Sequence, residues 1–369
     1  MFTTFKKILL TAVFLLTTAM MIQAQKKQSG ITIIAYYDGD ASRIDQYPVE
    51  KLTHIIYSFC HLKGNRLNVD DAKDTATIQH LVGLKKRNPS LKVILSLGGW
   101  GGCKPCSEVF NTEAGRKEFA ASTKELTDYF KTDGLDLDWE YPAIEGHPGH
   151  QFLPEDRHNF TMLCKELRKS LGKSKEISFA AGGFIKYLKE SIEWKEVMPL
   201  VDKVNLMTYD LVNGYTKVTG HHTPLYSSPQ QSESTDHCVT YLIDTLKVAK
   251  NKLVIGAAVY ARVYDAFSTE NNGLYQPGKF NYGVSYKEID TRLSEANGFK
   301  YYWDDVAKAP YLFNAEKKQL ASYDDKKSIR LKTQYAIDKG LNGIMFWQLG
   351  DDKGKDGLVD EMYKTKMGE

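Results

Sequence analysis

The chain has few cysteines, little net charge and no low-complexity segment or internal repeat. Its 369 residues hold five cysteines and carry a formal net charge of +3. Five cysteines are too few for a disulfide scaffold. So small a charge gives no sign of the clustered basic face that phosphate binding needs, and we therefore do not expect nucleic acid as a partner.

Only one long apolar run is present, and it lies at the N-terminus. Lys6 and Lys7 precede the apolar run Ile8–Met21, and Ala24 offers a small residue for cleavage. This pattern predicts a secretory signal peptide at 1–24. An uncleaved membrane anchor is the alternative, but the run is shorter than the roughly 20 residues that span a bilayer. We expect a secreted or periplasmic protein with no stable membrane anchor.

Cys103 and Cys106 form a C-x-x-C pattern in a glycine-rich loop. A zinc site would need two further ligands, and no second C-x-x-C or histidine pair at suitable spacing occurs, so no metal is expected. A local disulfide is the preferred interpretation in an oxidising compartment, with free thiols as the alternative. Cys60 and Cys164 lie in apolar surroundings and are expected to be small buried side chains.

Short runs rich in β-branched and apolar residues recur along the chain, and amphipathic stretches separate them. The predicted strands are Ile31–Tyr37, Thr53–Phe59, Lys92–Leu97, Gly134–Glu140, Glu176–Ala181, Lys203–Tyr209, Lys252–Tyr260 and Gly343–Gln348. The predicted helices are Asp74–Lys86, Gly115–Thr132, His158–Leu171, Thr235–Lys250 and Lys326–Lys339. Strands that alternate with helices imply parallel βαβ units, and eight units close an α/β TIM barrel, (β/α)8. A doubly wound open sheet is the alternative, but no glycine-rich phosphate turn follows the first strand.

The connection after the seventh strand is too long and too aromatic for a plain barrel loop. We predict a small α+β insertion at about 265–321, with one helical piece near Tyr286–Ala296. The rest of 25–369 is expected to form one catalytic barrel.

The most informative stretch is Asp133-Gly134-Leu135-Asp136-Leu137-Asp138-Trp139-Glu140. Because side chains on a strand alternate between faces, Asp136, Asp138 and Glu140 share one face, which in a barrel points into the lumen. Three carboxyls stacked in a core of low dielectric constant cannot all ionise freely, so the pKa of at least one is raised. Glu140 lies nearest the C-terminal mouth and is the candidate general acid.

This acidic strand resembles the signature of glycoside hydrolase family 18, the chitinase family. Three further motifs lie in the order the family has: Ser96-Leu97-Gly98-Gly99-Trp100, Met207-Thr208-Tyr209-Asp210 and Met345-Phe346-Trp347-Gln348. The resemblance covers the chain from Ile31 to about Asp352. It implies a retaining hydrolysis of chitin or N-acetylglucosamine oligomers without a cofactor, in which the substrate's own acetamido group is the nucleophile.

The resemblance also implies roles for the residues that match these motifs. Glu140 protonates the leaving oxygen, Asp138 orients the acetamido N–H, Asp136 shares a proton with Asp138, and Tyr209 holds the acetamido oxygen. Further residues are expected to bind substrate or to support these groups; they are Tyr36, Ser96, Gly99, Trp100, Met207, Asp210, Tyr215, Arg262 and Trp347. Ala258 and Ala261 depart from the family pattern around Arg262, and Tyr215 stands where many relatives have tryptophan.

Two other functions share this signature. A chitin-binding lectin on the same fold usually lacks the acid, whereas Glu140 is present here together with Asp138 and Tyr209. An endo-β-N-acetylglucosaminidase acting on N-glycans has the same acidic strand. The insertion and the aromatic residues favour a groove for a linear polymer instead. We expect the protein to act as a monomer.

Overall fold

The computed structural model describes residues 30–369, and the predicted signal peptide lies outside them. Within the described residues, eight parallel strands close a barrel because β1 pairs with both β14 and β2. The barrel strands are β1 (Thr32–Tyr37), β2 (His54–Lys63), β4 (Lys92–Gly98), β5 (Gly134–Asp138), β6 (Glu176–Gly182), β7 (Lys203–Met207), β8 (Leu253–Ala258) and β14 (Gly343–Trp347). A short strand, β3 (Arg66–Asn68), pairs antiparallel with the end of β2. The TIM barrel prediction is confirmed, and the open doubly wound sheet is excluded.

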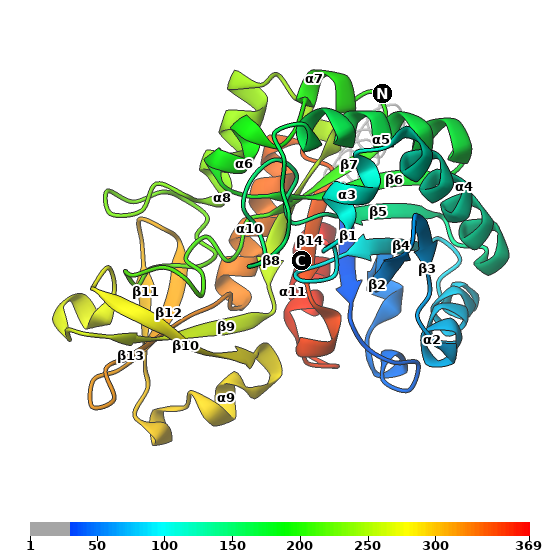
Figure 1. Cartoon of the computed structure of the whole chain (residues 1–369). Helices are drawn as coiled ribbons and strands as arrows, with labels where there is room; N and C mark the ends of the chain where they lie inside the picture. The colour runs from blue at the N-terminus through cyan, green and yellow to red at the C-terminus, as the bar shows by residue number, and fades with distance from the viewer. Residues whose placement is uncertain (1–29) are drawn as a thin grey trace, which may run out of the picture.

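Helices cover the outside of the barrel (Figure 1). Their apolar faces pack on the outward-facing strand residues, as in α4, which buries Phe119, Ala120 and Phe130. The helices outside the insertion are α2 (Ala72–Gly83), α3 (Cys106–Phe110), α4 (Glu113–Phe130), α5 (Asp156–Leu171), α6 (Ile185–Glu190), α7 (Trp194–Val197), α8 (Thr235–Thr240), α10 (Lys326–Lys339) and α11 (Leu358–Met367).

Two predicted helices differ from the structure. The helix predicted over Thr235–Lys250 is α8 followed by one π turn, Tyr241–Thr245, and Lys247 then adopts a left-handed backbone conformation that ends it. The helical piece predicted near 286–296 is a series of short turns around α9 (Ile289–Arg292), because the backbone leaves the helical region at Leu293 and is extended at Ser294.

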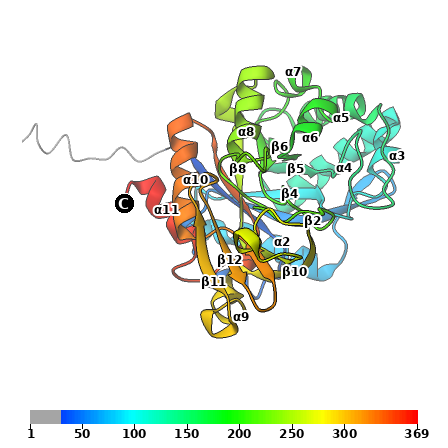
Figure 2. The ribbon, with the colours of Figure 1, turned by 90° about the vertical axis from the view of Figure 1, so that its left-hand side faces the viewer.

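The insertion after β8 is a five-stranded antiparallel sheet in the order β10-β9-β13-β12-β11. Its strands are β9 (Tyr260–Ala266), β10 (Gly278–Ser285), β11 (Lys300–Asp304), β12 (Ala309–Asn314) and β13 (Gln319–Ser322). The sheet lies beside the barrel, on the side away from α4 and α5 (Figures 1 and 2). It begins at Tyr260, five residues earlier than the sequence suggested, because β9 follows β8 after a single intervening residue.

Three apolar clusters build the interior. The largest lies between the strands and the outer helices, a small one fills the lumen, and a third supports the insertion. Cys103 and Cys106 are joined by a disulfide, with Cα atoms 5.2 Å apart, as predicted. Cys60 and Cys164 are buried free thiols, also as predicted. None of the helices in residues 30–369 is long and apolar enough to cross a membrane.

Candidate active site

Asp136 is the deepest of the three predicted carboxyls and is completely buried in the lumen. It accepts four hydrogen bonds: from Ser178 at 2.6 Å, Ser96 at 2.9 Å, Tyr36 at 3.1 Å and Asn205 at 3.1 Å. Burial raises its pKa, and these four donors oppose the rise. Ser96, one of the residues expected to bind substrate or to support the catalytic groups, thus contacts Asp136.

Asp138, the next carboxyl on β5, is in a different situation. Only 4% of it is exposed, and among the described residues its Oδ1 atom has no hydrogen-bond partner. Burial, then the neighbouring charges of Glu140 and Asp136, raise the pKa of Asp138 far above its usual value. A buried oxygen without a hydrogen-bond partner is costly in free energy.

Glu140 follows the end of β5 and is half-buried at the C-terminal mouth of the barrel. Burial raises its pKa to about 7; a hydrogen bond from Tyr141 opposes the rise and the charge of Asp210 adds to it. A carboxyl that is still half protonated near neutral pH can donate a proton and later take one back.

Asp210 lies directly after the predicted Tyr209 and is held by three side chains. Both its oxygens accept hydrogen bonds from Arg262, and its Oδ1 also accepts one from Tyr260 at 2.8 Å. The His222 ring lies 3.3 Å from the same oxygen. Although burial alone would raise it, hydrogen bonds from Arg262 and His222 hold the pKa of Asp210 well below its usual range. Asp210 is therefore ionised and fixed.

Tyr209 is half-buried beside this ion pair. Among the described residues, its hydroxyl contacts a single polar partner, the Met345 sulfur at 3.9 Å. Its ring meets that of Tyr260 edge to face, with centroids 6.3 Å apart. The hydroxyl is thus positioned by ring packing and stays available to a ligand.

Aromatic rings form the floor of the mouth. Trp347 ends β14, is half-buried, and stacks on Phe59 with ring centroids 5.5 Å apart. Tyr36 lies 6.1 Å from Trp347 but is only 1% exposed, so it supports the floor from below and binds Asp136 instead of facing the mouth. Trp347 is the partly exposed ring of this floor, and a flat aromatic face suits the apolar face of a pyranose.

Two more predicted aromatic residues are highly exposed. Trp100, 48% exposed, lies against Tyr141 and His147, with ring centroids at 6.5 and 5.3 Å. Tyr215 is 61% exposed in the loop after β7. Met207 is 9% exposed in the lumen cluster, and Gly99 lies so close to Phe59 that a Cβ atom there would be 2.4 Å from the ring.

Sequence reasoning missed several residues of this site. Tyr141 contacts Glu140, Ser178 and Asn205 bind Asp136, Tyr260 and His222 hold Asp210, and Phe59 stacks on Trp347. Ser178 and Asn205 are polar residues inside otherwise apolar strands, and this was the signal that could have found them. Tyr141 and His222 belong to loops, Tyr260 belongs to the insertion, and Phe59 lies on β2; no local pattern gives the contact of any of these four residues.

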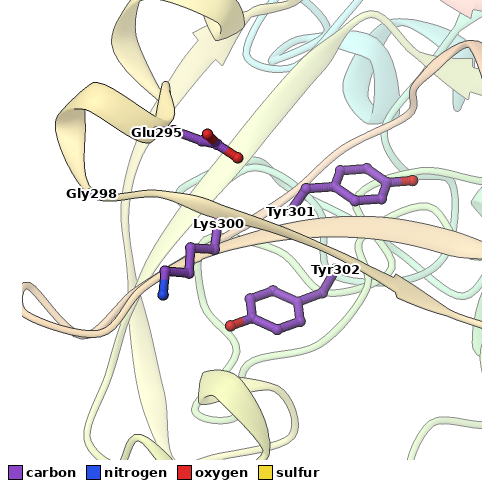
Figure 3. Close-up of a pocket in the computed structure, with 5 residues that line it drawn as sticks. All are labelled: Glu295, Gly298, Lys300, Tyr301 and Tyr302. Atoms are coloured by element: carbon purple, nitrogen blue, oxygen red, sulfur yellow. The ribbon is translucent and has the colours of Figure 1, made fainter.

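A separate pocket of about 520 Å³ lies on the insertion and contains none of the predicted site residues. Glu295, Gly298, Lys300, Tyr301 and Tyr302 line it. In Figure 3 the side chains of Lys300 and Tyr301 point away from each other, so they do not converge on one ligand. Within residues 30–369, no group of three or more histidine, cysteine, aspartate or glutamate side chains is placed so that it could hold a metal ion.

The site is a row of three carboxyls, Asp136, Asp138 and Glu140, that follows the fourth strand of an α/β barrel and ends at the barrel mouth. Residues 32–352 match the model of the family glycosyl hydrolases family 18. The chain therefore belongs to glycoside hydrolase family 18.

Similar proteins include chitinase A1 of Niallia circulans, 34% identical over 308 residues, and chitinase B of Serratia marcescens, 28% identical over 385 residues. The matches cover 77% and 86% of this chain, but 44% and 77% of those two proteins. Among solved structures, a family 18 N-acetylglucosaminidase from Paenibacillus barengoltzii superposes with a TM-score of 0.84 at 36% identity, covering 91% of this chain and 99% of that one.

Proposed function

We propose that this protein hydrolyses β-1,4 linkages between N-acetylglucosamine units in chitin or chito-oligosaccharides. The observation that carries the proposal is the combination of Glu140, whose pKa is raised to about 7 at the mouth, with Asp138, whose buried Oδ1 has no hydrogen-bond partner among residues 30–369. The first is suited to proton transfer and the second to an amide N–H. Chitinases among the similar proteins support the same substrate class.

In the first step, Glu140 donates its proton to the glycosidic oxygen while the substrate's acetamido oxygen attacks the anomeric carbon. The bond to the leaving sugar breaks, and a cyclic oxazolinium ion forms within the substrate. The acetamido group replaces the carboxylate nucleophile of ordinary retaining glycosidases. An attack within one bound molecule has the advantage of an oriented intramolecular reaction.

Asp138 accepts a hydrogen bond from the acetamido N–H, which aligns the carbonyl and stabilises the positive charge that develops on the ring. Tyr209 donates its hydroxyl to the acetamido oxygen. Trp347 supplies the surface beneath the reacting sugar, and the Asp210–Arg262 ion pair fixes the neighbouring wall.

In the second step, Glu140, now a carboxylate, takes a proton from water, whose oxygen attacks the anomeric carbon and reopens the oxazolinium ring. Two successive displacements at one carbon retain its configuration. The first product is therefore the β-anomer.

A second candidate is the release of single N-acetylglucosamine units from chain ends. It is favoured by the similarity to the Paenibacillus N-acetylglucosaminidase, which extends over 99% of that chain. A time course on the N-acetylglucosamine hexamer separates the two: internal cleavage gives dimers to tetramers first, whereas end-wise release gives the monomer and pentamer.

The decisive test uses partially deacetylated chitosan. Since the nucleophile belongs to the sugar that becomes the new reducing end, every new reducing end must be N-acetylated. Sequencing of the products and proton NMR of the fresh anomers measure this. Glucosamine at new reducing ends, or an initial α-anomer, contradicts the mechanism.

We further propose that residues 25–369 are the mature catalytic unit, exported to the periplasm or the medium, and that it acts as a monomer without a cofactor. The basic and apolar pattern of residues 1–24 supports export. N-terminal sequencing of the exported protein and light scattering check these proposals.

A further inference from the structure

Behind the Tyr209 side of the site lies an ion pair with no exposed atoms. Lys332 on α10 and Asp324, which follows β13, are each 0% exposed, and the Lys332 Nζ lies 2.6 Å from Asp324 Oδ2. The same ammonium donates to the carbonyl and to the hydroxyl of Thr223, at 2.7 and 2.5 Å. An ammonium has three N–H donors, and each has a partner here.

Thr223 connects the ion pair to the segment that carries Tyr209. Its hydroxyl lies between two acceptors, the carbonyl of Thr208 at 3.1 Å and Asp324 Oδ2 at 3.2 Å, and the Thr208 carbonyl belongs to the peptide bond leading into Tyr209. The Thr208 hydroxyl also bonds to both the N–H and the carbonyl of Gly256 on β8, each at 3.0 Å. The backbone entering Tyr209 is thus fixed on both sides.

Asp324 anchors the other wall. Its Oδ2 accepts the N–H of Ala258, the last residue of β8, at 3.1 Å, and its Oδ1 accepts the Ser328 hydroxyl at 2.7 Å. From Ala258 the chain runs directly into β9, which carries Tyr260 and Arg262, two of the three partners of Asp210. One buried ion pair therefore joins the end of β7, the end of β8 and the start of the insertion.

His222 adds a second connection. It precedes Thr223, its ring faces Asp210 at 3.3 Å, and its carbonyl accepts the N–H of Leu211 at 3.0 Å. Because Lys332 holds the neighbouring Thr223 carbonyl, it also sets where the His222 ring lies relative to Asp210.

We propose that Lys332 and Asp324 are positioning residues, which act through Thr223 and Ala258 to hold Tyr209 and Asp210 in the geometry that the reaction needs. The effect on catalysis rests on the proposed hydrolysis. The hydrogen bonds that anchor the backbone do not depend on that proposal. Neither residue touches the substrate.

The test removes the pair without leaving a lone buried charge, which by itself would be strongly destabilising. The double variant Lys332→Met with Asp324→Asn keeps the shapes and loses the donors to Thr223. A matched control is Lys203→Met with Glu176→Gln, which removes another buried ion pair, 2.5 Å long, at the opposite end of the barrel. Both are assayed on the N-acetylglucosamine hexamer, well below their melting temperatures.

We expect the first double variant to lower kcat roughly 10- to 100-fold with KM changed less than threefold, since small misplacements of a positioning group act on the transition state. The control is expected to stay within about threefold of wild type even if its melting temperature falls as far. Equal losses in both variants would show that the Lys332–Asp324 pair serves only the stability of the fold.

The same pair of changes is then made in a background that carries both Tyr209→Phe and Asp210→Asn. If the pair acts through these two residues, its removal there costs less than about threefold, because contacting groups are not additive. The full 10- to 100-fold loss in this background would overturn the inference.

Hydrogen exchange decides the anchoring independently of any substrate. The amides of 208–211 and of His222 and Thr223 are expected to exchange at least about tenfold faster in Lys332→Met with Asp324→Asn, and to be unchanged in the control. Unchanged exchange there refutes the inference, whereas a wild type that cleaves no N-acetylglucosamine oligomer refutes only the proposed function.

Discussion

Glu140 and Asp210 are acidic side chains at the same mouth, but their surroundings move their pKa values in opposite directions. Glu140 is desolvated and has one opposing hydrogen bond, from Tyr141, so its pKa rises to about 7. Asp210 is also desolvated, but Arg262 and His222 more than offset the burial and hold its pKa low. Glu140 is therefore kept able to exchange a proton near neutral pH, whereas Asp210 is kept charged.

This division predicts a pH profile. Because Glu140 must be protonated in the free enzyme, kcat/KM should fall as pH rises through about 7. Asp210→Asn removes a negative charge that raises the pKa of Glu140, so this basic limb should move to lower pH. Tyr141→Phe removes a hydrogen bond that lowers the pKa of Glu140, so the limb should move to higher pH. Initial rates at low substrate from pH 4 to 9 measure both, and shifts in the same direction would contradict the assignment.

Glu140→Gln tests the same residue more directly. The amide keeps the shape of the carboxyl but cannot deliver a proton, so turnover should fall by roughly 10²–10⁴ or more while binding of the oligomer persists. Calorimetric titration with the hexamer and a turnover assay separate the two effects. Retention of more than about a tenth of wild-type turnover would show that another group supplies the proton.

At the scale of elements, alternation along β5 was enough to place Asp136 and Asp138 in the lumen and Leu135 and Leu137 in the outer core, as the structure has them. Strand periodicity is a local property, so the sequence displays it. The same holds for Trp139, which packs outward against Phe110 and Phe160.

Contacts between distant elements were not predictable in this way. Asn205 reaches Asp136 from 69 residues away and His222 reaches Asp210 through a loop that has no regular pattern. The early start of the insertion was missed because the end of β8 and the start of β9 lie in one apolar run, Leu253–Ala261, and the break at Val259 lies inside this run without a change in composition.

The disulfide lies between β4 and the start of α3. Cys103–Cys106 closes a very short loop, so in the chain-entropy account it stabilises the fold by about 2 kcal/mol at most. Replacing both cysteines by alanine should therefore lower the melting temperature by only a few degrees. Calorimetry measures the change, and alkylation with mass spectrometry of the unreduced wild type should find no free thiol at these two positions. Two labelled thiols there would show that the bond does not form.

Considered as a whole, the barrel has polar clusters of opposite electrostatic character at its two ends. At the mouth, Asp138 and Glu140 have raised pKa values, since burial penalises their charged forms. At the bottom, Glu176 is also penalised by burial, but His54 and Lys203 reverse the effect, and its pKa lies far below its usual range. The catalytic end thus costs stability when it ionises, and the bottom gains stability from its charge.

These opposite shifts predict how stability changes with pH. Glu140 has a folded pKa of about 7, above the unfolded value near 4.3, so wild type should gain stability relative to Glu140→Gln as pH falls from about 7 toward 4.3. Glu176 has a folded pKa below its unfolded value, so its contribution is complete above about pH 4.3 and is lost as pH falls further. Wild type should therefore lose stability relative to Glu176→Gln below that pH. Urea unfolding of the three proteins at a series of pH values measures both differences; if neither difference in the free energy of unfolding changes with pH, the pKa of neither carboxyl is shifted by folding. Taking differences between proteins is essential, because the buried His222, whose pKa is lowered by burial, adds the opposite slope near neutral pH in all three.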